Sequence, residues 1–262
     1  MTIGNKTTAI WPKLHDEQCI GYDAKGCYRH FLSDNPNFNG FEGKGYNTNF
    51  GHDISYAFNE YGHRSLNDLP GVPVRYSEKH FLVVGGSQTF GIGVPIEKTY
   101  PHLISERLGM EYYNLALPGA SHDVNIFNLI WYLARRKPLF VLWEWLFDSR
   151  NCLVLDTRDN TVLPLISMMI EKQEKAFDLP GLTDFFLSAN DIGYNHTRRL
   201  MHKGILDNMK YKDNIVVHEY DFNKTDLKNK QIDVGRDGEH FGIETHERMA
   251  ELIYEAHLYR WG

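Results

Sequence analysis

A chain of 262 residues with 42% hydrophobic and 13% aromatic residues can bury the core of one ordinary domain, which excludes a disordered chain. Its net charge of -6, with no run of five like charges, excludes the basic surface that nucleic acid or an anionic membrane requires. Three cysteines, an odd number, indicate free thiols in a reducing compartment rather than a disulfide framework.

The first 78 residues form a region rich in glycine, asparagine and aromatic residues, without a helical period. We predict an irregular N-terminal extension with short strands, packed on a main domain that covers residues 79–262. One arm of a hairpin is expected at Ile54–Phe58. The polar start MTIGNKTTAIWPK lacks the apolar core of a secretory leader, and no apolar stretch is long enough to span a bilayer. We therefore expect a cytoplasmic protein, or a virion component if the source is a phage, with no membrane or nucleic-acid partner.

Four side chains of types that bind zinc lie within sixteen residues near the start: His15, Cys19, Cys27 and His30. Their spacing is not that of a zinc finger or knuckle, so unrelated thiols and surface imidazoles are favoured over a metal site. We expect neither a metal nor an organic cofactor.

From Lys79 onward, short apolar runs alternate with helical patterns. Strands are predicted at 80–84, 111–115, 139–143 and 214–218. Helices are predicted at 95–109, 121–136, 195–209 and 243–259, the first ending at Gly109 and the second capped by Ser121. This alternation predicts a parallel sheet with helices on both faces, in a flavodoxin-like three-layer α/β/α domain.

Residues 146–194 interrupt this alternation, and we interpret them as an insertion, with a lid as one interpretation. The one helical pattern within it lies at Leu163–Phe177.

Ser87 follows the predicted strand 80–84, in the run GGSQTFG at 85–91. In an open parallel sheet the active crevice lies beyond the carboxyl ends of the strands, so this serine is a candidate nucleophile. The flanking glycines allow a sharp turn and a close approach of substrate. A phosphate-binding loop is disfavoured, because no Gly-Lys-Ser/Thr follows and Gly91-x-Gly93 lacks the third glycine of a dinucleotide fingerprint. A structural serine in a glycine turn remains an alternative.

Asp237 and His240 lie directly before the last predicted helix. A carboxylate and an imidazole three positions apart can share one turn, so that the carboxylate orients the ring and the ring accepts a proton from a hydroxyl. The alternative is that Asp237 caps the helix and His240 is a surface residue. With 13 histidines in the chain, we interpret His122, Asp123 and His246 as ordinary polar residues.

Together the two segments resemble the SGNH, or GDSL-like, hydrolase family, whose serine follows the first strand and whose Asp-x-x-His precedes the last helix. The stretch VVGGSQTFGIGVPIEKTYPHLISERLGMEYYNLALPGASHD is similar to the first two blocks of that family, and DGEHFGIETHERMAELI to the last. The resemblance covers the chain from about residue 80 to the end, except the insertion. It implies an esterase in which Ser87 attacks, His240 carries the proton and Asp237 orients it. The Ser87 and Gly119 N–H groups would form the oxyanion hole, although Pro118–Gly119 is alternatively a plain turn.

Two blocks depart from the family pattern. Gly86 stands where an aspartate usually precedes the serine. After the third strand, Asp148 stands where the family has an oxyanion asparagine, and a carboxylate repels a developing negative charge. Asn151 is an alternative third donor and Arg150 an alternative source of positive charge. If neither acts, the hole has two donors, and the enzyme is slower or prefers a different acceptor.

Upstream, FNEYGHR at 58–64 resembles an Asn-x-x-Gly-x-Arg segment of some carbohydrate-modifying family members. The resemblance implies that Asn59 and Arg64 contact the substrate, as Arg150 and Asp148 would from the altered third block. The alternative for Arg64 is a solvated arginine in a turn.

The aromatic and asparagine-rich extension favours an O-acylated carbohydrate as the ester substrate, through ring stacking and hydroxyl contacts. Two other functions stay open. One is a glycan-binding module on the same fold that has lost catalysis. The other is an acyltransferase that passes the acyl group to a sugar in a dry pocket under the insertion. The sequence does not predict the oligomeric state.

Overall fold

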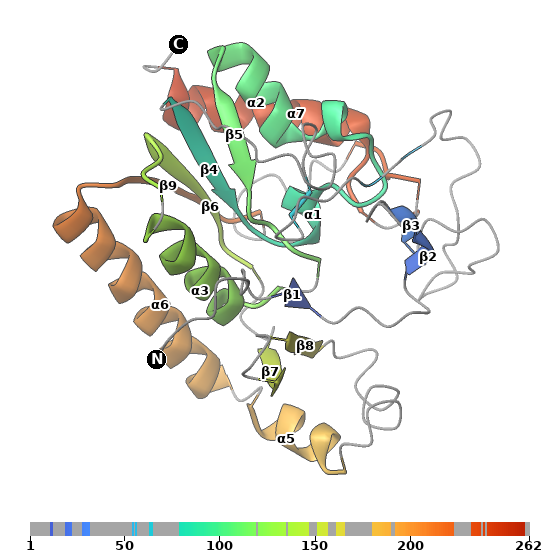
Figure 1. Ribbon diagram of the computed structural model, residues 1–262, viewed down its shortest axis with the longest axis vertical. Coiled ribbons are helices and arrows are strands. Elements are labelled where there is room, and N and C mark those ends of the chain that lie inside the picture. The colour runs from blue at the N-terminus through green and yellow to red at the C-terminus, as the bar shows by residue number, and fades with distance from the viewer. Residues whose placement is uncertain are drawn as a thin grey trace.

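Four parallel strands form the central sheet of the protein, seen here in a computed structural model (Figure 1). The described residues are 11–12, 19–22, 28–31, 54, 56, 63–64, 79–118, 120–134, 136–146, 151–156, 161–165, 180–189, 192–222, 232–236, 238 and 240–259. The strands are β4 (His80–Val84), β5 (Glu111–Asn114), β6 (Phe140–Glu144) and β9 (Val216–Tyr220), in the order β5-β4-β6-β9. The first strand in sequence thus lies between the second and the third. This order places a topological switch point between β4 and β6, where open α/β sheets bind their ligands.

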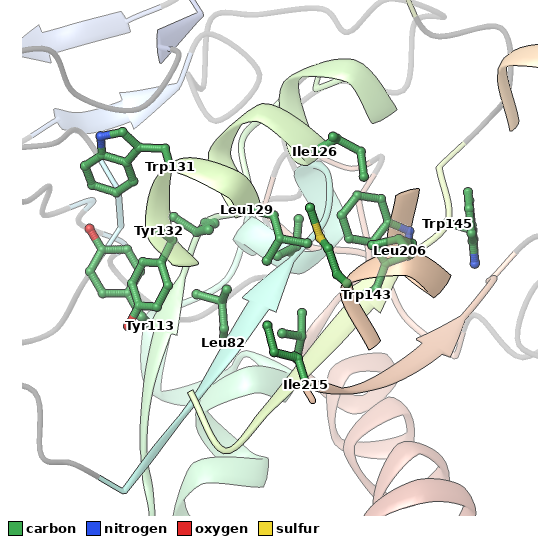
Figure 2. Close-up of a cluster of buried hydrophobic side chains, with 14 residues drawn as sticks. Leu82, Tyr113, Ile126, Leu129, Trp131, Tyr132, Trp143, Trp145, Leu206 and Ile215 are labelled. Atoms are coloured by element: carbon green, nitrogen blue, oxygen red, sulfur yellow. The ribbon is translucent and has the colours of Figure 1, made fainter. Parts of the chain in front are cut away.

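Side chains of β4 alternate between two apolar cores, one on each face of the sheet. Leu82 and Val84 pack with helices α3 (His122–Leu133) and α6 (Ile192–Asp213), as Figure 2 shows for Leu129 and Leu206. Phe81 and Val83 pack on the other face with α2 (Tyr100–Leu108) and α7 (Ile243–Ile253), which continues into the π-helical turn η6 (Tyr254–Leu258). The predicted three-layer α/β/α arrangement is confirmed.

The predicted elements of the main domain are confirmed with shifts of a few residues at their ends. Gly109 ends α2 in the left-handed conformation, with φ of 59°, and Ser121 caps α3 by accepting a hydrogen bond from the Val124 N–H at 3.5 Å. Helix α2 starts later than the predicted residue 95, because a short 3₁₀ turn, η3 (Ile96–Lys98), and an extended Thr99 precede it.

The insertion contains a hairpin where part of a helix was predicted. Strands β7 (Asn151–Asp156) and β8 (Thr161–Leu165) pair antiparallel, and the helix α5 (Leu182–Ala189) follows. The predicted helix at 163–177 is therefore wrong for its first three residues, where the pattern of apolar residues did not distinguish a strand from a helix and Pro164 disfavours a helix interior. The rest of that prediction lies outside the described residues. Figure 1 shows the hairpin beyond the carboxyl ends of the sheet strands.

Short strands in the N-terminal region agree with the predicted extension. β1 (Trp11–Pro12) pairs parallel with β8, and β2 (Cys19–Tyr22) pairs antiparallel with β3 (Tyr28–Phe31). Of the four residues weighed as zinc ligands, Cys19 and His30 lie on this hairpin, while His15 and Cys27 lie outside the described residues. The predicted hairpin arm at 54–58 is described only at Ile54 and Tyr56. Within the described part of the chain, every helix is too short or too polar to cross a bilayer.

Candidate active site

Ser87 starts the short helix α1 (Ser87–Phe90), immediately after β4 and a turn made by Gly85 and Gly86. The turn needs glycine at 85, because a Cβ there would lie 2.3 Å from Glu144 Oε2 and 2.2 Å from the Thr89 hydroxyl oxygen. Ser87 is 6% exposed, and its hydroxyl has no hydrogen-bond partner among the described residues. The sequence therefore places this serine at the carboxyl end of β4, beside the switch point.

The peptide that joins Gly86 to Ser87 has a defined direction. The Phe90 N–H donates to the Gly86 carbonyl oxygen at 2.9 Å. Because a trans peptide is planar and its C=O and N–H point in opposite directions, the Ser87 N–H points away from α1. This orientation is compatible with the predicted role of that N–H as an oxyanion donor.

The segment that carries His240 packs directly on the turn that carries Ser87. The Phe241 N–H donates to Gln88 Oε1 at 2.9 Å, a contact between residues 153 positions apart. The Arg236 N–H donates to the Gly93 carbonyl at 2.8 Å, so a second bond joins the same two segments. His240 is half-buried, and no hydrogen bond joins its ring to Ser87 among the described residues. Catalytic hydrogen bonds often tighten only when substrate binds, so the proximity of the segments is the relevant finding.

Asp233 caps the last helix, the role weighed above for Asp237. Its carboxylate accepts from the Thr245 N–H at 2.8 Å and the Glu244 N–H at 3.1 Å, which satisfies the first turn of α7. The Gly235 N–H donates to the His240 carbonyl at 2.8 Å and holds the loop before the helix closed. Asp237 lies outside the described residues, so its pairing with His240 stays a prediction.

His246, interpreted above as an ordinary polar residue, is fully buried between α7 and α2. Its Nδ1 accepts from the Tyr100 N–H at 3.2 Å, and its ring stacks on the Tyr100 ring at 5.9 Å. Burial, with smaller contributions from Arg64 and His240, lowers the pKa of His246 to about 3. His246 is therefore neutral at pH 7 and links α7 to α2.

Arg64 lies beneath the loop that follows Ser87, where it is buried and does not face solvent as a substrate ligand would. Its Nη1 donates to the carbonyls of Phe90 and Gly91 at 2.9 and 2.5 Å, and its Nη2 to that of Val94 at 2.8 Å. The guanidinium also lies 4.5 Å from the Tyr56 ring centre. Gly91 has φ of 81°, and this left-handed turn aims the carbonyls at one point. These contacts hold the loop that follows Ser87, and they occupy the guanidinium that was predicted to contact substrate.

Replacing Arg64 by lysine is expected to lower the free energy of unfolding by about 3 kcal/mol, because one ammonium cannot replace the planar fork that serves three carbonyls. Urea unfolding would measure the change. The matched control is Arg107→Lys, an exposed arginine that lies 4.8 Å over the Tyr254 ring, with an expected change within about 0.5 kcal/mol. Equal stability of the two variants would contradict the role assigned to Arg64.

A buried carboxylate lies under the Ser87 turn and was not predicted as a functional residue. Glu144 ends β6, on the other side of the switch point, and its Oε2 accepts from the Gly86 N–H at 2.7 Å and the Thr89 hydroxyl at 2.5 Å. The Tyr100 hydroxyl lies 2.7 Å from that of Thr89 and hydrogen-bonds the Tyr220 hydroxyl. The strand pattern at 139–143 indicated burial but not this partner.

A second polar cluster lies at the start of α3, on the α6 side of the sheet. Asp123 accepts from His202 Nε2 at 2.9 Å and from Arg198. The His122 ring lies 5.0 Å from that of Trp145, and burial, with His202 and Arg199 adding to it, lowers the His122 pKa to about 3. The contacts of Asp123 thus link α3 to α6, and those of His122 link α3 to Trp145. A single sequence does not reveal such pairs.

The other predicted site residues, or their side chains, lie outside the described part of the chain. Gly119, Asn59, Asp148 and Arg150 are outside the described residues, and Asn151 is described only as the first residue of β7. The loop before Gly119 does reach the nucleophile turn, because the Leu117 N–H donates to the Gly85 carbonyl at 3.3 Å. Among the described side chains, no group of three or more metal-binding residues comes together.

No protein-family model matches the chain, and no curated protein is significantly similar to it in sequence. Among solved structures, the chain is similar to a family two carbohydrate esterase from Clostridium thermocellum in complex with cellohexaose, at 14% identity over 73% of this chain and 67% of that one, with a TM-score of 0.37. It is similar to a lipase/acylhydrolase from Enterococcus faecalis, at 14% identity over 70% and 96%, with a TM-score of 0.38. It is also similar to a lipolytic protein of the G-D-S-L family from Veillonella parvula, at 17% identity over 70% and 99%, with a TM-score of 0.36. The names of these three proteins are those of esterases and lipolytic proteins.

Proposed function

We propose that the protein is a serine ester hydrolase of the SGNH type, with Ser87 as nucleophile and His240 as the group that carries the proton. The observation that supports this most is the hydrogen bond from the Phe241 N–H to Gln88 Oε1. It joins the residue after the predicted base to the residue after the predicted nucleophile. The Ser87 motif and the His240 motif, far apart in the sequence, thus lie together at the carboxyl ends of the strands, as the family resemblance predicts.

The reaction proceeds in two steps through a covalent acyl-serine. The Ser87 oxygen attacks the ester carbon while His240 takes the hydroxyl proton. The tetrahedral intermediate collapses, its C–O bond to the alcohol breaks, and His240 gives the proton to the leaving alcohol. Water then attacks the acyl-serine with His240 as base, which releases the acid and restores Ser87.

The Ser87 N–H and the Gly119 N–H hold the oxyanion in this proposal, and Asp237 keeps the His240 ring oriented. Asn151 is proposed as a third donor in place of the asparagine that Asp148 displaces, with Arg150 as the alternative. The proposed substrate class is an O-acylated carbohydrate, with Asn59 and the aromatic residues of the N-terminal extension as sugar contacts.

A fluorophosphonate probe tests the proposal, because it reacts with an activated serine hydroxyl and not with an ordinary one. We expect stoichiometric labelling of Ser87, located by peptide mass spectrometry, and loss of labelling when the protein is unfolded first. Ser121, a buried serine that caps α3, serves as the internal control and should stay unlabelled. An unlabelled Ser87 in the folded protein would favour the glycan-binding alternative over the hydrolase.

A further inference from the structure

The carboxylate of Glu144 is the end point of a buried chain of hydrogen bonds under the nucleophile turn. Glu144 is 5% exposed, and Thr89 and Tyr100 are fully buried. The Thr89 hydroxyl donates its one proton to Glu144, so the Tyr100 hydroxyl must donate to the Thr89 oxygen. The Tyr220 hydroxyl then donates to Tyr100. Thr89 and Tyr100 each give one proton and accept one, Tyr220 gives one, and all three hydroxyls point toward the carboxylate.

In this direction Glu144 Oε2 accepts both from the Gly86 N–H and from the Thr89 hydroxyl. Burial raises the pKa of Tyr220, and the negative charge of Glu144 raises it further. Tyr100 is affected in the same direction by burial, by Tyr220 and by Glu144. Both phenols therefore keep their protons and remain donors. The chain is fixed in one orientation, and its members polarise one another.

The residue that Glu144 holds is the one before Ser87. Gly86 has no side chain that could fix its own position, and it precedes α1 in an extended conformation with φ of -107° and no side-chain cap. Two bonds fix its two peptides. Glu144 accepts from the Gly86 N–H, and Phe90 donates to the Gly86 carbonyl. Without the first bond, the chain between Gly85 and Ser87 could rotate, and the Ser87 N–H and hydroxyl would lose their common direction.

We propose that Glu144 is a positioning residue for Ser87, acting across the switch point through the Gly86 N–H and the Thr89 hydroxyl. It supplies from β6 the support that the residue before the serine, a glycine, cannot give. The proposal rests on the function proposed above. Glu144 lies under the turn and holds groups that contact substrate, without contacting substrate itself.

The test compares Glu144→Leu, which removes the acceptor, with Glu144→Gln, which keeps an oxygen in the same place. Both are assayed with p-nitrophenyl acetate, with turnover counted per active site titrated by a fluorophosphonate. We expect Glu144→Leu to lower kcat by about 50-fold and to change KM by less than about twofold. A displacement of the nucleophile by up to about 1 Å lowers the rate by a factor of this order. Glu144→Gln should restore kcat to within about fivefold of the wild type.

Glu219→Leu is the matched control. This carboxylate lies on the neighbouring strand β9, is half-buried and accepts from Trp145 Nε1 at 3.0 Å, but it does not reach the nucleophile turn. Its loss should leave kcat per active site within about twofold. If Glu144→Leu does not fold, Thr89→Val and Thr89→Ser replace it. The valine variant, without a hydroxyl, should lose about tenfold in kcat, and the serine variant should lose less than threefold.

The outcomes separate this inference from the function on which it rests. A wild-type protein that neither hydrolyses the ester nor reacts with the fluorophosphonate would overturn both. An active wild type in which Glu144→Leu and Glu219→Leu have the same kcat per active site and the same labelling rate would overturn the positioning role alone. A purely structural role would lower the unfolding temperature of Glu144→Leu without lowering its kcat per active site.

Discussion

Replacing Ser87 by alanine is expected to lower kcat for p-nitrophenyl acetate by about 10⁴-fold, with little change in KM. The variant has no oxygen that can form the acyl intermediate, so only water attack assisted by the oxyanion donors remains. Folding should be preserved, because the Ser87 hydroxyl has no hydrogen-bond partner among the described residues and a methyl group fits the same space. Initial rates at several substrate concentrations, together with unfolding temperatures, measure both effects.

Ser121→Ala provides the control for this measurement. Its hydroxyl caps α3, so its removal should cost about 1 kcal/mol of stability and leave kcat unchanged. The two serine variants should thus differ in opposite ways, one in turnover and one in stability. Turnover by Ser87→Ala equal to that of the wild type would remove Ser87 from the mechanism.

The layers of the fold were predictable because β4 and β6 are short buried runs and because recognisable helical patterns stand between most of the strands. The alternation of Leu82 and Val84 with Phe81 and Val83 assigns one set of side chains to each face, although the sequence alone does not say which helices cover which face. The insertion was harder, because the apolar pattern at 161–165 does not by itself distinguish a helix from a strand, and only Pro164 argues against a helix before the pairing with β7 is known.

The meeting of Ser87 with the His240 segment was predictable from family motifs, but the residues that support the turn were not. Arg64 and Glu144 act through hydrogen bonds to main-chain groups, which any sequence offers at every position. Their partners are 26 and 58 positions away in the chain. The sequence indicated an arginine at a turn and a glutamate at a strand end. It could not indicate that both are buried under the same loop.

Acidification from pH 7 to pH 5 is expected to lower the free energy of unfolding by on the order of 5 kcal/mol. Burial lowers the pKa of His63, His122 and His246 to about 3, from the ordinary value of 6.5. The unfolded chain therefore takes up these protons before the folded protein does. Stability is fully present above pH 6.5 and is lost as the pH falls toward 3, by about 1.4 kcal/mol per histidine and pH unit. A domain has only about 5–15 kcal/mol in total, so this loss removes between about a third and all of its stability by pH 5.

Urea unfolding at several pH values between 5 and 7 tests the origin of this dependence. His246→Asn keeps an acceptor for the Tyr100 N–H but removes one titrating ring. The slope of unfolding free energy against pH should fall by about a quarter, because burial also lowers the pKa of His218, to about 4. His196→Asn, on the exposed side of α6, is the matched control for the loss of a histidine side chain. Identical slopes in all three proteins would assign the acid sensitivity to carboxylates instead. In that case the packing of α7, and of the His240 loop before it, against α2 at neutral pH would not depend on a neutral His246.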